Sequence, residues 1–521
     1  MAPERLTEAD ALRYHSQQRP DHPAIVFRDR VTTYRELDSS SNRIANGLCA
    51  LSVPRGGRVA ILAKNSSDFF ELLFGILKAG MTVLPLNWRL AVPEITAILC
   101  DAAVEALIVE DTFAPVVPQL RASCPTLAHV IVTGAPLPAT GDVGLHLGPW
   151  RAAHSAVDPL TPVSPEDIMI QFYTSGTTGD PKGVQISHRS SSAMRRMEVE
   201  SAEDWMQWSA DDVAIVALPN FHLSGTSWAL QWLARGATCV VQEQVDPGAF
   251  LQAIPRYRVT QLFAVPTVID LMLASPALPT LDLSSLRVIY YGGAPMSPAL
   301  LTRALAAFRC SFVQIYGMTE NNGTICYLTP ADHLQGDTRL LASCGRPLPS
   351  IDLRILDAGG HEKQPGDVGE ICIRSPSLMS GYWRREALTQ SSFHGRHFRT
   401  GDAGYRNERG YLFLVDRLKD MIVSGGENIY PAELERVLFQ HPVIADVAVV
   451  GVPDPRWGEA VTAVVVRKTA DLDADEVIRC VKSRLAAYKA PKRVVFVDAL
   501  PRNANGKVLK RVLRDRLTTS S

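Results

Sequence analysis

The strongest chemical signal in the sequence is a loop of small, hydroxyl-bearing and basic residues. Residues 173–184 read YTSGTTGDPKGV. Glycines let backbone N–H groups close on an anion because no Cβ stands in the way. Hydroxyls add donors and a lysine adds a mobile positive charge, so the loop suits a polyphosphate. The residues to which we assign this role are Thr174, Ser175, Gly176, Thr177, Thr178, Gly179 and Lys182.

Two other interpretations of this loop are less consistent with its sequence. A Walker A loop requires Ser or Thr after its Gly-Lys pair, whereas Gly183 follows Lys182 here. A flexible surface loop could have the same composition. The length and order of the string, and its place directly after a strand expected at residues 168–172, favour phosphate binding.

The loop resembles the signature of the adenylate-forming superfamily, which includes acyl- and aryl-CoA synthetases, peptide-synthetase adenylation domains and beetle luciferase. The resemblance covers nearly the whole chain and is closest to fatty-acyl- or aryl-CoA synthetases. It implies an acid–thiol ligase that uses ATP and Mg²⁺. Such an enzyme activates a carboxylic acid as its acyl-adenylate, releases pyrophosphate, and then transfers the acyl group to coenzyme A.

Residues 316–320, YGMTE, resemble the second core motif of this superfamily. The resemblance places Tyr316 against the adenine ring, Thr319 near the α-phosphate and Glu320 on Mg²⁺. Gly317 also belongs to the predicted ATP/AMP-binding residues. One carboxylate together with phosphate oxygens is a usual way to hold Mg²⁺. Taken alone, the same string could be a turn with a solvated glutamate.

The turn formed by Gly292, Gly293, Ala294 and Pro295 follows a strand expected at residues 288–291. In the superfamily, this turn flanks both the adenine and the acyl group. Ligands of open α/β sheets bind beyond the carboxyl ends of the strands, so the position is consistent with that role. A plain β-turn is the alternative.

Asp402 lies in a Thr-Gly-Asp string that resembles the ribose-binding motif. A carboxylate can accept hydrogen bonds from both ribose hydroxyls. By the same resemblance, Arg417 is a second ribose contact and Lys419 is the interdomain hinge. This charged stretch could otherwise be a solvated turn.

Lys507 ends the string PRNANGK, which resembles the C-terminal catalytic motif, although many members carry threonine where Asn505 stands. The carboxylate and the α-phosphate repel each other by roughly 4 kcal/mol at about 4 Å and an effective dielectric near 20. A compact ammonium on a long stem can offset this repulsion. A lone lysine near a C-terminus is usually only a solvated charge, but the preceding motif favours catalysis.

The thioester step requires a second arrangement of the C-terminal region. By resemblance, that domain rotates about Lys419, so that Lys507 leaves and the loop with Gly425 and Gly426 enters. Further residues on the CoA side are Trp457, Tyr488 and Lys489. For Trp457, simple packing is the alternative.

The acyl pocket is predicted by resemblance, and its composition is mostly apolar. His222 matches a position that often gates the carboxylate, although it could be a packing histidine. The pocket stretch has no aspartate to bind an α-amine and no arginine for a second carboxylate. A medium-chain or longer fatty acid is therefore the first choice and an aryl or cinnamate-like acid the second. The predicted lining is Phe221, His222, Leu223, Gly225, Trp228, Val265, Met318 and Asn321.

Three rival functions share this sequence pattern. An acyl-AMP ligase that loads a carrier protein would carry out the same first half-reaction. A luciferase-like oxygenase uses the same scaffold, but nothing in the sequence requires it. A non-catalytic nucleotide-binding protein would be expected to lack Lys507, Glu320 or Asp402, and all three are present.

The expected elements alternate between strands and amphipathic helices, which predicts mostly parallel sheets covered on both faces. Thr33 and Glu36 have capping-box spacing, Ser67 is the expected cap of the next helix, and Gly80 its end. Residues 1–418 are expected to form a doubly wound N-terminal adenylation domain with a β-rich part after about residue 340. Residues 419–521 are expected to form a small, mobile α+β domain. Strands are expected at residues 59–62, 107–109, 130–132, 168–172, 213–218, 262–265, 288–291, 447–450 and 461–466, and a helix at 432–439.

Composition limits the remaining possibilities. The chain has 521 residues and a net charge of −1, so no basic field indicates nucleic acid or an anionic membrane. Neither a signal peptide nor an apolar run of about 18 residues is evident. The nine cysteines are scattered, which is typical of reduced thiols in a cytoplasm. The oligomeric state, a homodimer being one option, and the pathway are left open.

Overall fold

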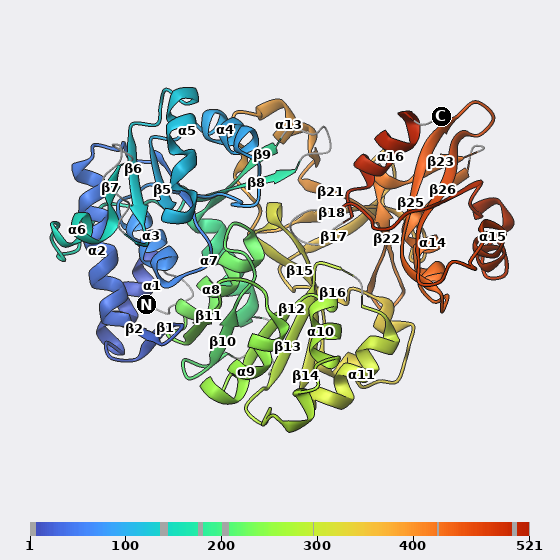
Figure 1. Ribbon diagram of the computed structural model, residues 1–521, viewed down its shortest axis with the longest axis horizontal. Helices are drawn as coiled ribbons and strands as arrows, with labels where there is room; N and C mark the ends of the chain where they lie inside the picture. The colour runs from blue at the N-terminus through green and yellow to red at the C-terminus, as the bar shows by residue number, and fades with distance from the viewer. Residues whose placement is uncertain are drawn as a thin grey trace. The chain divides into compact units, whose positions relative to one another are not determined.

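The structure is a computed structural model that describes residues 7–135, 144–175, 181–200, 208–294, 296–424, 427–502 and 508–519 (Figure 1). The chain forms two compact units. The first consists of Met1–Asp352 and Arg374–Phe393, and the second of Leu353–Ile373 and His394–Ser521. The domain boundary and hinge at Lys419 stay predictions, because compactness does not reveal where a chain bends.

One sheet of the first unit carries the predicted phosphate loop. Its strand order is β19-β9-β8-β4-β3-β5-β6-β7. The strands from β8 to β7 are parallel, whereas β9 is antiparallel to both β8 and β19. The strands are β3 (Arg58–Leu62), β4 (Thr82–Pro85), β5 (Ala106–Glu110), β6 (His129–Thr133), β7 (Leu145–His146), β8 (Ile168–Ser175), β9 (Pro181–Ser187) and β19 (Gly381–Tyr382).

Helices cover this sheet and form its core with it. A buried cluster joins Ile98 of α4 and Leu120 of α5 to Leu107 of β5. On the chain these helices alternate with the strands, as a doubly wound sheet requires. The helices are α2 (Tyr34–Ala50), α3 (Ser67–Lys78), α4 (Val92–Asp101), α5 (Val117–Ser123), α6 (Leu147–Ala152), α7 (His188–Glu200) and α13 (Glu386–Ser391).

The second sheet of this unit has the order β16-β15-β14-β13-β12-β10-β11-β1-β2. Its strands from β14 to β1 are parallel. They are β1 (Pro23–Phe27), β2 (Arg30–Thr33), β10 (Val213–Val216), β11 (Thr238–Val241), β12 (Gln261–Ala264), β13 (Val288–Gly292), β14 (Ser311–Met318), β15 (Gly323–Leu328) and β16 (Arg346–Pro347). Its helices are α1 (Glu8–Gln18), α8 (Leu223–Leu233), α9 (Pro247–Tyr257), α10 (Pro266–Leu273), α11 (Pro298–Phe308) and α12 (Pro330–His333).

The second unit is richer in antiparallel strands. One of its sheets has the order β17-β18-β21-β20, with β22 paired to β21, and the other β24-β23-β26-β25, with β27 paired to β26. The strands are β17 (Asp352–Leu356), β18 (Gly369–Arg374), β20 (Phe393–His394), β21 (His397–Arg406), β22 (Leu412–Arg417), β23 (Ile422–Ser424), β24 (Glu427–Ile429), β25 (Ile444–Asp454), β26 (Gly458–Arg467) and β27 (Arg493–Phe496). The helices are α14 (Pro431–Leu438), α15 (Ala474–Lys482) and α16 (Lys510–Thr519). The predicted fold class is confirmed.

Local signals in the sequence fix several helix ends. Thr33 caps α2, and the Glu36 carboxylate accepts a hydrogen bond from the Thr33 backbone N–H, as the capping-box spacing predicts. Gly80 follows the end of α3 with a φ of +68°, a conformation that favours glycine. The cap predicted at Ser67 is wrong by one residue: the Ser66 hydroxyl accepts from the Phe69 backbone, and Ser67 is already helical.

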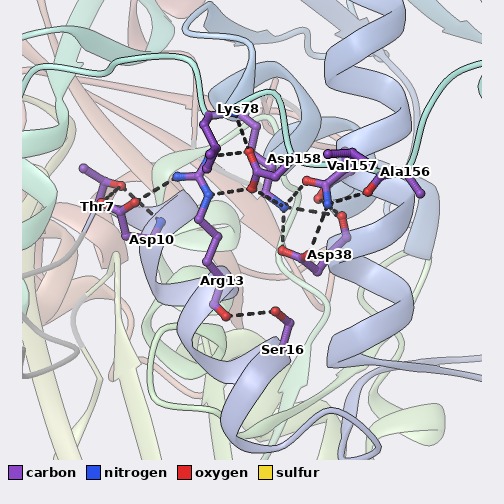
Figure 2. A network of polar contacts seen from close by, with 12 residues as sticks. Thr7, Asp10, Arg13, Ser16, Asp38, Lys78, Ala156, Val157 and Asp158 are labelled. Carbon is purple, nitrogen blue, oxygen red and sulfur yellow. Dashed lines mark hydrogen bonds and ion pairs between the residues drawn. The ribbon is translucent and has the colours of Figure 1, made fainter.

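A buried lysine joins three helices of the first unit (Figure 2). The Lys78 side chain at the end of α3 is fully buried, and its Nζ lies 2.6 Å from Asp38 and 2.7 Å from Asn42, both on α2. Asp158 lies 3.8 Å away and also pairs with Arg13 of α1 at 2.6 Å. Burial lowers the pKa of Lys78, and Asp38 partly offsets that effect. The network therefore depends on keeping its charges paired.

We expect Lys78→Met to lower the free energy of unfolding by about 3 kcal/mol, because it leaves a partly buried carboxylate without its partner. Urea unfolding of the full chain measures this. The double variant with Asp38→Asn should recover part of the loss, since it removes the stranded charge. Parental stability of Lys78→Met would contradict the assignment.

No helix in the described part of the chain is long and apolar enough to cross a membrane.

Candidate active site

The predicted phosphate loop connects β8 to β9, which pair up to Thr174↔Lys182 and Ser175↔Pro181. Gly176, Thr177, Thr178 and Gly179 lie outside the described residues. The strand end before the loop is held by Tyr173, whose hydroxyl donates to Asp101 at 2.5 Å. Burial, and then this hydrogen bond, raises the pKa of Tyr173, so the phenol stays a donor. Asp101 thus fixes where the loop begins.

Tyr382 links the base of this loop to the second core motif. Its ring centroid lies 5.4 Å from the Lys182 Nζ, and its hydroxyl donates to Glu320 Oε1 at 3.0 Å. Burial, and then the Glu320 charge, raises the pKa of Tyr382, so this phenol also stays protonated. The structure therefore brings Lys182 and Glu320 to the same tyrosine, although Lys182 lies on β9 of one sheet and Glu320 follows a strand of the other sheet.

The second core motif leaves the sheet at the end of β14. Tyr316 is buried within the strand, and Thr319–Asn321 form one turn of 3-10 helix directly after Met318. A Cβ on Gly317 would lie 2.2 Å from the Gly323 carbonyl oxygen of β15, so only glycine fits there. Tight pairing of β14 with β15 thus fixes the position of Thr319 and Glu320.

Glu320 suits a hard cation. The Tyr382 hydroxyl donates to one oxygen of the Glu320 carboxylate. Because this donor is neutral, it does not compensate the negative charge that would attract a cation. Mg²⁺ takes one or two protein carboxylates and completes its shell with phosphate oxygens and water. The donor set thus fits Mg²⁺ bound together with a polyphosphate. Mg²⁺ would supply charge neutralisation at the phosphates, and its binding at Glu320 stays a prediction.

The glycine turn emerges at the same sheet edge, because Gly292 at the end of β13 pairs with Ile315 of β14. A Cβ on Gly292 would lie 2.4 Å from the Ile315 carbonyl oxygen, and Gly293 has a φ of +77°. Both positions thus require glycine. Gly293 and Ala294 are exposed. Pro295 lies outside the described residues.

The predicted acyl-pocket residues divide into two groups. His222, Leu223, Val265 and Met318 are half-buried near the ends of their elements. Phe221, Gly225, Trp228 and Asn321 are buried. Both functional groups of the Asn321 side chain are bonded within the protein, to the Thr324 carbonyl and the Ser377 hydroxyl. Asn321 thus has a structural role here, and its contact with an acyl group stays a prediction.

Asp402 and Arg417 lie opposite each other on β21 and β22, with Arg417 Nε 2.7 Å from Asp402 Oδ1. Asp402 is buried, while the Arg417 side chain is 41% exposed. The guanidinium thus fixes the carboxylate that is predicted to bind ribose. Lys419 lies in the short 3-10 helix Leu418–Asp420 that follows β22.

Asp402→Asn should raise the KM for ATP about tenfold, because a charged acceptor for ribose hydroxyls is lost. The sharper readout uses 2′-deoxy-ATP. The parent should discriminate against it, whereas the variant should treat both nucleotides nearly alike. Glu362→Gln, which alters an ion-paired surface carboxylate of the same unit, is the control and should keep the parental preference. If Asp402→Asn discriminates between ATP and 2′-deoxy-ATP as strongly as the parent, Asp402 does not bind the ribose.

The residues predicted on the CoA side occupy the second unit. Gly425 and Gly426 connect β23 to β24 but lie outside the described residues, as does Lys507. Trp457 is half-buried, with the Arg456 guanidinium 4.9 Å and the Lys492 Nζ 5.1 Å from its ring. Tyr488 is 45% exposed. Lys489 pairs with Glu433 at 2.7 Å, which gives it a structural partner as well.

Sequence reasoning missed Tyr382 and Asp101. Tyr382 had no detectable signal, because its position depends on the pairing of β19 with β9, about 200 residues earlier in the chain. Arg456 and Lys492 lie within the two strings, residues 456–459 and 488–492, that resemble CoA-side elements.

Comparison with known proteins identifies the class of this arrangement. The model of the AMP-binding enzyme family matches residues 12–383, and that of the AMP-binding enzyme C-terminal domain matches residues 433–507. The chain therefore belongs to the AMP-binding enzyme family, the adenylate-forming superfamily predicted from its motifs. It is an adenylate-forming acid–thiol ligase that binds ATP and a carboxylic acid.

Individual relatives differ in acid and acceptor. The fatty acid–[acyl-carrier-protein] ligase ScoC of Streptomyces coeruleorubidus is 39% identical over 516 residues, covering 99% of this chain and 97% of ScoC. The indoleacetate–CoA ligase of Aromatoleum aromaticum is 39% identical over 95% of each chain. Among solved structures, ATP-bound MatB of Rhodopseudomonas palustris is 31% identical with a TM-score of 0.87, covering 98% of this chain and 99% of MatB.

Proposed function

We propose that this enzyme is an ATP-dependent acyl-CoA synthetase that activates an apolar acid, with a fatty acid as its first substrate class. The observation that carries the proposal is the meeting of Lys182 and Glu320 at Tyr382. A cation and a metal-binding carboxylate on either side of one tyrosine form a site for the phosphates of ATP. The Gly292–Gly293 turn, at the same sheet edge as Tyr316, provides close backbone approach for the adenylate.

The first half-reaction joins the carboxylate to the α-phosphorus and expels pyrophosphate. One carboxylate oxygen forms the new P–O bond as the bond to the pyrophosphate oxygen breaks. Lys182 and the hydroxyls of residues 174–178 would hold the departing pyrophosphate, and Lys507 would offset the charge at the α-phosphate. In the second half-reaction, a thiol attacks the acyl carbonyl and AMP leaves.

An aryl acid is the second substrate class. Half-buried Leu223, Val265 and Met318 offer apolar contacts to either an aliphatic chain or a ring. ScoC supports the first class by its name, and the indoleacetate–CoA ligase supports the second.

Coenzyme A is the proposed acceptor. Trp457 with Arg456 and Lys492 combines an aromatic face with two cations, which suits a phosphorylated adenine nucleotide. A carrier protein is the second candidate, because ScoC, of similar length, is named for that acceptor.

The test is a panel of aliphatic and aryl acids, incubated with ATP, Mg²⁺ and either CoA or a holo carrier protein. Pyrophosphate release and loss of free thiol are scored together. The proposal predicts both signals with CoA and at least one apolar acid. Thiol loss with the carrier protein but not with CoA would show that the carrier protein is the acceptor. Absence of pyrophosphate release with every acid would overturn the proposed function.

A further inference from the structure

A cluster of aromatic rings fills the space between α8 and the second sheet. The ring centroid of Trp228 lies 5.1 Å from that of Tyr290 on β13 and 5.6 Å from that of Phe263 on β12. Trp208 and Trp232 pack against the same indole at 6.2 and 5.1 Å. Trp228 is 6% and Tyr290 1% exposed, so these two rings form a closed surface.

Hydrogen bonds hold both rings in place. The Trp228 Nε1 donates to the Ile215 carbonyl at 2.9 Å, and the Trp208 Nε1 donates to the Tyr290 hydroxyl at 2.7 Å. Buried indole N–H and phenol groups need such partners, and a ring that swung away would leave them unsatisfied. The closed surface is therefore a fixed feature of the fold.

The closed surface lies directly below the glycine turn. Side chains alternate along β13, and Ile289 and Tyr291 belong to the core formed with α9, α10 and α11. Tyr290 and Gly292 thus share the opposite face, two residues or roughly 7 Å apart along the strand. Val265 lies beside Gly293, and a Cβ there would be 3.8 Å from its Cγ1. Exposure falls from Gly293 through half-buried Val265 to buried Tyr290.

Buried charges lie behind the aromatic rings. The Arg235 guanidinium sits 4.3 Å from the Trp208 ring and pairs with Glu198 at 3.3 Å. Gln231 donates to Glu198 at 2.9 Å and accepts from Arg235 at 2.7 Å. An alkyl chain that passed Trp228 would meet this network and could not replace its hydrogen bonds.

The small cavity beside α7 and α8 offers no room for a long chain either. The cavity between α7 and α8, lined by Met194, Ser227 and Leu230 among others, measures about 10 Å³. That volume holds one water at most.

We propose that Trp228 and Tyr290, braced by Trp208, form the floor of the acyl pocket and restrict the enzyme to compact acids. These are acids with a short aliphatic chain or a single ring. The inference rests on the proposed function, because it takes the Gly292–Gly293 turn as the carboxyl end of the pocket. It narrows the substrate class from the medium- or long-chain fatty acids expected from the sequence to short-chain and single-ring acids.

The experiment compares butanoate, hexanoate, dodecanoate, hexadecanoate and phenylacetate by acid-dependent pyrophosphate release. The parent should use hexanoate and phenylacetate with kcat/KM about tenfold or more above that for dodecanoate. Trp228→Ala should shift the preference toward dodecanoate by about tenfold or more, because it opens the floor. Trp228→Phe should retain the parental order, since it keeps a ring in place.

A matched control separates specificity from general damage. Trp150→Ala removes a buried indole on α6 of the same unit and should leave the chain-length order unchanged. If Trp228→Ala does not fold, Tyr290→Leu tests the same floor. Binding of hexanoyl- and dodecanoyl-sulfamoyl adenosine, measured by calorimetry, gives a readout that does not depend on turnover or on the thiol acceptor.

The possible outcomes are distinguishable. Equal use of hexanoate and hexadecanoate by the parent would refute the proposed pocket floor and leave the proposed function intact. An unchanged chain-length order in a folded Trp228→Ala variant also overturns it. No pyrophosphate release with any acid, but tighter binding of the hexanoyl analogue, would refute the function and retain the floor.

Discussion

Glu320→Gln should form acyl-adenylate about a hundredfold or more slowly than the parent at a fixed Mg²⁺ concentration. The change removes the negative charge proposed to bind the metal but keeps an oxygen for the Tyr382 hydroxyl, 3.0 Å away in the parent. Geometry is thus preserved while the electrostatic interaction is lost. Exchange of labelled pyrophosphate into ATP, titrated with Mg²⁺, measures the effect, and the variant should need more Mg²⁺ for half-maximal exchange.

Tyr382→Phe is the matched control for this prediction. It removes the hydrogen bond to Glu320 but leaves the carboxylate, so the rate should fall by about tenfold or less and the Mg²⁺ requirement should stay parental. A Glu320→Gln enzyme with the parental rate and Mg²⁺ requirement would show that this carboxylate does not bind the metal.

Lys507→Ala should slow adenylate formation by roughly a hundred- to a thousandfold, the usual cost of losing one preorganised group that stabilises developing charge. The rate of thioester formation from supplied acyl-adenylate should remain close to parental, because in that step the thiol attacks the acyl carbonyl and no anion approaches the α-phosphate. Rapid-quench measurement of each half-reaction separates the two rates.

Lys468→Ala controls for the loss of a positive charge in the same unit. Lys468 bonds a backbone carbonyl, that of Pro442, at 2.9 Å, and has no proposed part in catalysis. Both half-reactions should proceed at parental rates in this variant. Equal losses of both half-reactions in Lys507→Ala would instead indicate a structural role for Lys507.

Local interactions made much of the first unit predictable from sequence. The capping box of Thr33 and Glu36 involves residues three apart, and Gly80 ends α3 through its own backbone conformation. The strand expected at residues 288–291 is β13, extended by Gly292. The wrong cap at Ser67 arose because two adjacent serines carry the same local signal, and only the final chain direction selects Ser66.

Contacts between segments that are distant along the chain could not be predicted from the sequence. Tyr382 reaches Glu320 across 62 residues. The pairing of β19 with β9 and the hydrogen bond from the Met379 N–H to the Glu320 carbonyl bring it there. The proposed floor of the acyl pocket could not be predicted from the sequence either. The motif resemblance predicts Trp228 in the pocket, but the proposed floor also needs Tyr290, which a hydrogen bond ties to Trp208, 82 residues earlier.

The most direct test of the central claim is acid-dependent exchange of labelled pyrophosphate into ATP by the purified enzyme, without any thiol acceptor. We predict exchange that requires Mg²⁺ and a compact apolar acid such as hexanoate, and that is strongly reduced in Glu320→Gln. Exchange that is absent with every acid, or that proceeds equally without acid, would contradict adenylate formation at this site.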